Sequence, residues 1–152
     1  MNLAIWDIES SSASTDFGSI IEIGGVLVDE NFKEKDRFNL RCRLPEGEIF
    51  QAMALIVNKT SIKKLTQANL SHYQMLAEVE KIFKKWSPAI FLGWSNIGFD
   101  DEMIRKEFFK GIRYPYLTNA APNKRHDGIN IARAAYAVDP NILEVEFNEK
   151  NN

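Results

Sequence analysis

The sequence predicts a mixed α/β domain in which three antiparallel strands come first and helices and strands then alternate. Residues 3–9 and 19–28 are apolar runs of strand length, and residues 37–44 alternate strictly between polar and apolar side chains. After Pro45 the apolar residues recur at helical spacing. With 152 residues, 45% of them hydrophobic, the chain has the size of one compact domain with its own core.

Helical spacing and turn signals divide the second half of the chain into further elements. Ser71 is a good N-cap for the longest helix, and Asp127 is one for the last helix. The expected elements are a weak helix over 60–70, a helix between Ser71 and Pro88, a strand over 89–94, and helices over 99–111 and 128–138. This order is typical of a layered α/β domain.

Charge and cysteine content exclude several classes of protein. Lys and Arg total 19 against 21 Asp and Glu, so a protein that wraps a nucleic-acid backbone is excluded and any such contact must be local. Cys42 is the single cysteine, which favours a reducing compartment. The N-terminus lacks the positively charged residues that begin a signal peptide, and Asp7 interrupts its apolar run too early for one. We therefore expect a soluble cytoplasmic protein without a membrane span.

Two acidic residues lie at the C-terminal end of the first predicted strand. Asp7 and Glu9 are two residues apart, so in a strand they share one face with Cα atoms about 7 Å apart. Like charges beside a buried run are costly unless a cation neutralises them, which points to a divalent metal. The alternative is that the strand has reached solvent and both acids are hydrated.

A second acidic cluster, Asn96-Ile97-Gly98-Phe99-Asp100-Asp101-Glu102, lies between a predicted strand and a helix. Acids in a first helical turn are also explained by the helix dipole alone. In open α/β sheets, however, the functional crevice lies at strand ends, so Asp100 can converge with Asp7 and Glu9.

Together the two clusters resemble a known family. Trp6-Asp7-Ile8-Glu9 and Gly93-Trp94-Ser95-Asn96-Ile97-Gly98-Phe99-Asp100-Asp101-Glu102 are similar to the first two motifs of the DEDD superfamily of 3′→5′ exonucleases, most of all to exonuclease I. Arg105, Phe108, Pro115-Tyr116 and Arg133-Ala134-Ala135-Tyr136-Ala137 fit the continuation of that pattern.

The resemblance implies a ribonuclease H-like fold and hydrolysis at the 3′ end of single-stranded DNA, an activity that serves DNA repair. Asp7, Glu9 and Asp100 then correspond to three of four carboxylates that bind two Mg²⁺ or Mn²⁺ ions, with Asp7 bridging them. Ser10 corresponds to a contact of the terminal nucleotide, and Asn96 would help to shape the same pocket.

One part of the family pattern is missing. The third motif consists of a histidine general base and the fourth carboxylate five residues later, but His126 is followed by Ile131 at that spacing. Residues 143–147 also alternate as a strand for which the sequence supplies no partner. We expect residues 1–152 to be one exonuclease domain truncated at its C-terminal end, and weakly active or inactive as it stands.

Two other functions remain open at this point. An RNA-trimming exonuclease of the same superfamily would need the same acids, since a metal site does not distinguish the sugars. A non-catalytic nucleic-acid-binding module with a degenerate exonuclease fold would account for the missing third motif.

Overall fold

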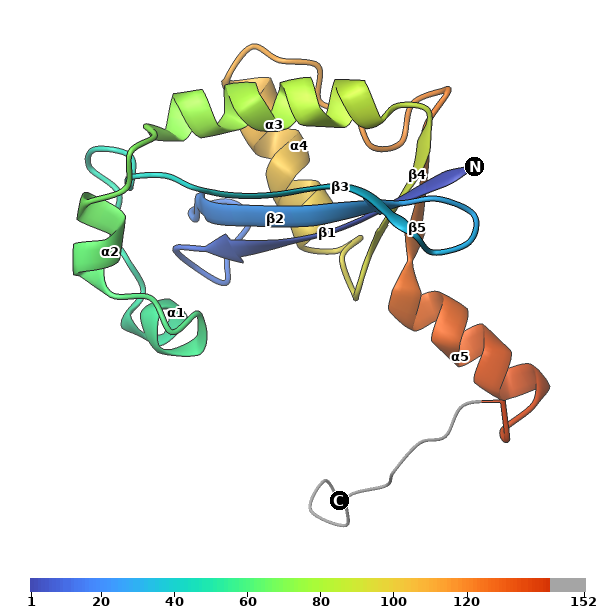
Figure 1. Ribbon diagram of the computed structural model, residues 1–152. Coiled ribbons are helices and arrows are strands. Elements are labelled where there is room, and N and C mark those ends of the chain that lie inside the picture. The colour runs from blue at the N-terminus through green and yellow to red at the C-terminus, as the bar shows by residue number, and fades with distance from the viewer. Residues whose placement is uncertain (143–152) are drawn as a thin grey trace.

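The computed structural model describes residues 1–142 and contains a five-stranded sheet with the order β3-β2-β1-β4-β5 (Figure 1). β1, β2 and β3 form antiparallel pairs, whereas β4 and β5 run parallel to β1. The strands are β1 (Asn2–Ser10), β2 (Ile20–Val28), β3 (Glu34–Arg41), β4 (Ala89–Gly93) and β5 (Lys124–Asp127). The expected mixed sheet, with three antiparallel strands first, is confirmed.

Two of the five helices cover one face of the sheet. The helices are α1 (Ala52–Val57), α2 (Ile62–Thr66), α3 (His72–Trp86), α4 (Asp100–Lys110) and α5 (Gly128–Val138). Ala4, Trp6 and Ile8 of β1 form one cluster with buried side chains of α3 and α4, such as Phe83 and Phe108. α5 points away from the sheet and has no buried residue (Figure 1). No helix in residues 1–142 is long and apolar enough to cross a bilayer.

Both predicted caps are present. The Ser71 hydroxyl accepts from the Gln74 amide while the Gln74 side chain accepts from the Ser71 amide, which completes a capping box. The Asp127 carboxylate accepts from the Ile129 amide at the start of α5. These contacts depend only on neighbours in the sequence, which is why the sequence predicts them well.

Two elements were not predicted from the sequence, and one strand differs from the prediction in its boundaries. β5 was not predicted, because its side chains, Lys124 to Asp127, carry no apolar pattern; it forms through backbone pairing with β4. α1 was missed because it has no side-chain cap and no buried residue. β3 begins at Glu34 and ends at Arg41, and Cys42 continues as an isolated bridge to Leu70. The strand expected over 143–147 lies outside the described residues.

The face of the sheet opposite α3 and α4 is called the open face here. Ile5, Asp7 and Glu9 point to it from β1, and Ile5 is 42% exposed. Asp7 and Glu9 pair directly with Gly24 and Glu22 of β2, so these residues share the open face. Alternation along β1 thus separates the core from the acids.

A buried acid ties the two covering helices to the sheet. Glu107 of α4 is 4% exposed, and its Oε1 accepts from the Ile20 amide at 3.1 Å. Its Oε2 lies 2.5 Å from Nε2 of His72 at the start of α3, without hydrogen-bond alignment. His72 is therefore the side chain of α3 that contacts this buried acid of α4.

We expect His72→Ala to destabilise the fold by about 1–3 kcal/mol, because Oε2 of the buried Glu107 would lose the polar side chain that contacts it. The exposed pair Glu78–Lys81 on α3 is the control. Lys81→Ala is expected to cost less than about 1 kcal/mol. Urea unfolding of both variants measures the difference, and equal losses would show that the buried contact contributes nothing special.

Candidate active site

The three predicted carboxylates lie around the carboxyl-terminal end of β1. Asp7 is exposed on the open face, Glu9 is half-buried two residues further, and Asp100 is the first residue of α4. Oδ1 of Asp100 accepts from the Ile8 amide at 3.2 Å, which holds this carboxylate against the strand between the other two. Tertiary structure therefore brings Asp100 to a strand residue, Ile8, that lies 92 positions earlier in the sequence, between the other two acids.

The environment of these acids disfavours negative charge. Burial first, and then the charge of Asp7 and a hydrogen bond with it, raise the pKa of Asp100 to about 7. Burial, followed by the charges of Asp7 and Glu22, raises the pKa of Glu9, and Arg41 opposes this increase. Within residues 1–142 no three such side chains are already arranged as a coordination shell. The donors are nevertheless oxygen atoms crowded at one edge, and they fit a hard divalent cation.

The second aspartate of the cluster has a structural role that the sequence did not indicate. Asp101 is 2% exposed and accepts from the Asn96 amide at 2.9 Å and from the Thr118 hydroxyl at 3.2 Å. Nε of Arg125 lies 3.7 Å away. Burial raises the pKa of Asp101 to about 6, and Arg125 opposes the increase. Asp101 thus fixes the turn that presents Asp100.

Asn96 belongs to this structural network. It is 1% exposed, and it lines neither of the two cavities beside the carboxylates described below. The family resemblance implies that Asn96 helps to shape the nucleotide pocket. In the structure Asn96 lies in the turn that precedes α4 and Asp100, and its side-chain amide donates to Asp101.

Gly93 is needed for this turn. A Cβ at Gly93 would lie 2.5 Å from Cβ of Asn96, so any larger residue must displace the turn. We expect Gly93→Ala to cost about 1–3 kcal/mol of stability, as overpacking of a fixed core does. Gly98, in the same turn, has nothing within 4 Å of a Cβ, so Gly98→Ala is the matched control and should be close to neutral. Thermal unfolding compares the two, and equal effects would contradict the close approach.

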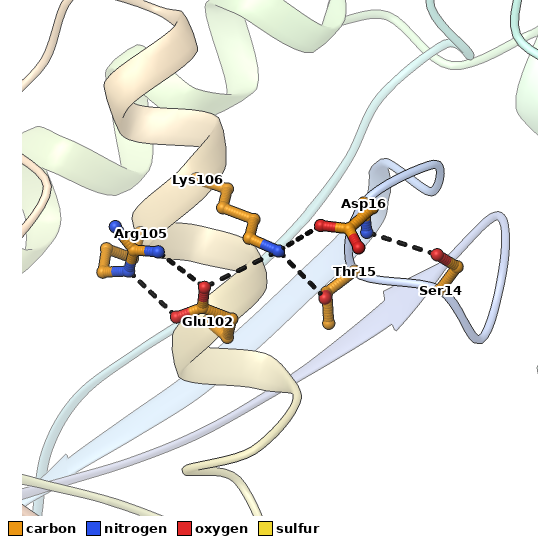
Figure 2. A network of polar contacts seen from close by, with 6 residues as sticks. All are labelled: Ser14, Thr15, Asp16, Glu102, Arg105 and Lys106. Atoms are coloured by element: carbon orange, nitrogen blue, oxygen red, sulfur yellow. Dashed lines mark hydrogen bonds and ion pairs between the residues drawn. The ribbon is translucent and has the colours of Figure 1, made fainter.

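The segment after β1 is tied to α4 (Figure 2). Nζ of Lys106 donates to Oγ1 of Thr15 at 3.1 Å and to Oδ1 of Asp16 at 2.5 Å. The Glu102 carboxylate pairs with Arg105 and lies 3.6 Å from Lys106. These exposed contacts contribute little stability each, but together they keep the end of β1 beside the start of α4.

Two cavities of about 230 Å³ each flank Glu9. The first is mainly apolar, with Ser10 beside the side chains of Met53, Val57 and Phe99. The second is polar, and its lining includes Asp7, Glu9, Glu22, Gly24 and Asn39. The first cavity therefore offers mainly apolar surface beside Glu9, and the second exposes the acids.

Ser10 and Asn58 connect these cavities. Ser10 is 8% exposed, lines the apolar cavity, and donates its hydroxyl to the Ser12 carbonyl at 2.7 Å. The Asn58 amide donates to the Ser10 carbonyl at 2.8 Å, and Asn58 lines both cavities. Sequence analysis missed Asn58, Met53 and Val57 because nothing in the local pattern places α1 against the end of β1.

Comparisons with known proteins agree with this fold. No model of a protein family matches the sequence. The exodeoxyribonuclease I of Buchnera aphidicola subsp. Schizaphis graminum is 22% identical over 151 residues, which is 98% of this chain and 31% of that protein. The exodeoxyribonuclease I of Haemophilus influenzae is 24% identical over 147 residues, covering 95% and 31%. The chain thus spans about a third of the length of these relatives.

The comparison with solved structures also finds exonuclease I. Escherichia coli exonuclease I in complex with a dT13 oligonucleotide matches with a TM-score of 0.89 and 19% identity, over 97% of this chain and 32% of that one. A product-bound structure of exonuclease I matches with a TM-score of 0.88 over 97% and 34%. The chain therefore has the ribonuclease H-like fold of the matched part of exonuclease I. The sequence relatives named above are exodeoxyribonucleases I as well.

Proposed function

We propose that these residues form the amino-terminal part of an exonuclease domain that removes nucleotides from the 3′ end of single-stranded DNA. The hydrogen bond that holds Asp100 on the Ile8 amide, between Asp7 and Glu9 and beside an apolar cavity at the end of β1, is the observation that carries the proposal. Further support comes from relatives that are exodeoxyribonucleases I and from the oligonucleotide bound to the Escherichia coli neighbour.

Asp7, Glu9 and Asp100 would hold two Mg²⁺ or Mn²⁺ ions. Asp7 is exposed on the open face, two residues before Glu9 and next to the strand position that holds Asp100, so it would be the most accessible ligand of the three. Asp100 has to release the proton held next to Asp7 before its carboxylate can act as a ligand. When bound, two such ions activate a water molecule and stabilise the leaving 3′ oxygen.

The apolar cavity would hold the terminal nucleoside. Met53 and Val57 of α1 and Phe99 before α4 supply apolar surface for the base, and Ser10 lies at the sugar side next to Glu9. Asn58 holds the backbone of Ser10 from the wall of the same cavity. This arrangement would place the scissile phosphate over the carboxylates.

The test uses a chain extended through a downstream helix that carries the family's third motif. It is incubated with matched DNA and RNA oligonucleotides labelled at the 5′ end, with Mg²⁺ or Mn²⁺. We expect DNA products that shorten progressively from the 3′ end and that disappear in Asp100→Ala. Preferential loss of RNA would favour an RNA-trimming enzyme, and binding without cleavage of either would favour a non-catalytic module.

A further inference from the structure

Trp94 is an exposed aromatic side chain on a fixed piece of backbone. It follows β4 directly and is 66% exposed. On one side, Gly93 is closely covered by Asn96; on the other, Ser95 has a φ of 58° and its amide donates to Oδ1 of Asp127 at 2.9 Å. The backbone is therefore held on both sides while the indole remains accessible.

The indole also has a fixed support. A Cβ added to Gly128, the first residue of α5, would lie 3.0 Å from Cε3 of Trp94 and 3.6 Å from Cζ3. The ring thus lies against a glycine and leaves the rest of its surface free. Because the ring is supported, the Trp94 side chain loses little conformational entropy when a ligand stacks on it.

The strand order places the end of β4 beside the part of β1 that carries the carboxylates. Leu92 is the last parallel partner, paired with Ile5, and Trp94 follows β4 two residues later, at the edge of the sheet where Asp7 also lies. Alternation puts Ile5 and Asp7 on the open face. Neighbouring strands are about 4.8 Å apart. Glu9 and the apolar cavity lie beyond Asp7 toward the end of β1, and Trp94 lies on the β4 side.

We propose that Trp94 stacks on the base of the nucleotide on the 5′ side of the scissile phosphate. The inference rests on the proposed exonuclease function. With the terminal nucleoside in the apolar cavity and its phosphate over Asp7, the strand leaves the site toward β4. Scattered exposed apolar residues are ordinary, but this one has a ring supported by Gly128 and follows the strand next to β1. Base stacking on an aromatic ring tolerates every base, which suits an enzyme without sequence preference.

The experiment is a titration of the 152-residue chain with single-stranded oligothymidylate, followed by tryptophan fluorescence in the presence of Mg²⁺. Trp6 and Trp86 are each 2% exposed, so Trp94 is the tryptophan that a base can reach. We expect quenching on binding and protection of Trp94 from acrylamide. Trp94→Leu should raise the Kd about 5- to 150-fold, the equivalent of the usual 1–3 kcal/mol per stacked base.

Three controls keep the outcomes separate. Phe109→Leu removes another exposed aromatic at the far end of α4 and should leave the Kd unchanged. Trp94→Phe should retain most of the affinity, and it replaces the leucine variant if that one does not fold. An oligonucleotide without a base at its penultimate position should bind the wild type and Trp94→Leu equally.

If the wild type binds DNA and Trp94→Leu binds it equally well, the stacking inference is wrong and the proposed function stands. If neither the 152-residue chain nor the extended chain binds single-stranded DNA, the proposed function fails and the inference fails with it.

Discussion

The 152-residue chain is expected to degrade single-stranded DNA about 10²–10⁴-fold more slowly than a chain extended through a downstream His-x₄-Asp helix. This factor is the usual contribution of a general base. The sequence contains two histidines, and neither is followed by a carboxylate five residues later, since those positions are Ala77 and Ile131. His72 is also engaged with Glu107, on the face of the sheet opposite the acids.

The measurement compares product lengths over time for both chains on the same 5′-labelled oligonucleotide. Asp100→Ala in each chain separates its own activity from that of a contaminating nuclease. Rapid shortening by the 152-residue chain that vanishes in Asp100→Ala would show that the third motif is dispensable. Slow shortening that persists in Asp100→Ala comes from a contaminant.

Divalent metal is expected to stabilise the chain through Asp7 and Asp100. At a concentration 100-fold above its Kd, a ligand specific for the folded state adds about 2.7 kcal/mol, or roughly 5–10 °C for a chain of this size. Asp7→Ala should abolish the increase caused by Mn²⁺. Asp100→Asn should also abolish it, yet raise the melting temperature without metal, because it removes one of two adjacent like charges and keeps an oxygen for the Ile8 amide.

This stabilisation should depend on pH. The pKa of Asp100 is raised from its ordinary value of 3.8 to about 7, chiefly by burial and then by Asp7. The metal-free chain therefore has the full benefit of protonated Asp100 below about pH 4 and loses it as the pH rises through about 7. Metal needs the ionised form, so its effect should grow over the same interval. Thermal unfolding with and without Mn²⁺ at pH 5.5 and 8 measures this, and an equal increase at both values would exclude Asp100 as a ligand.

The sequence by itself determines the elements whose signals are local. The helix after Ser71 and the helix after Asp127 begin where their caps predict, because a cap contacts amides two or three residues away. The alternation of β1 separates the core residues from Asp7 and Glu9 in the same way. The two acidic motifs could also be recognised from the sequence, since few kinds of site use carboxylates of these types at this spacing.

Only the tertiary structure decided how these parts meet. β5 has no apolar pattern and exists through its hydrogen bonds to β4, so its side chains carried no signal. Asp100 and Asp101 are neighbours in the sequence, yet helix geometry turns the first toward Ile8 and the second toward Asn96. The cavity formed with α1 depends on contacts between residues more than 40 positions apart, such as Asn58 with Ser10. Such contacts follow from the packing of the whole chain, which no local pattern of residues records.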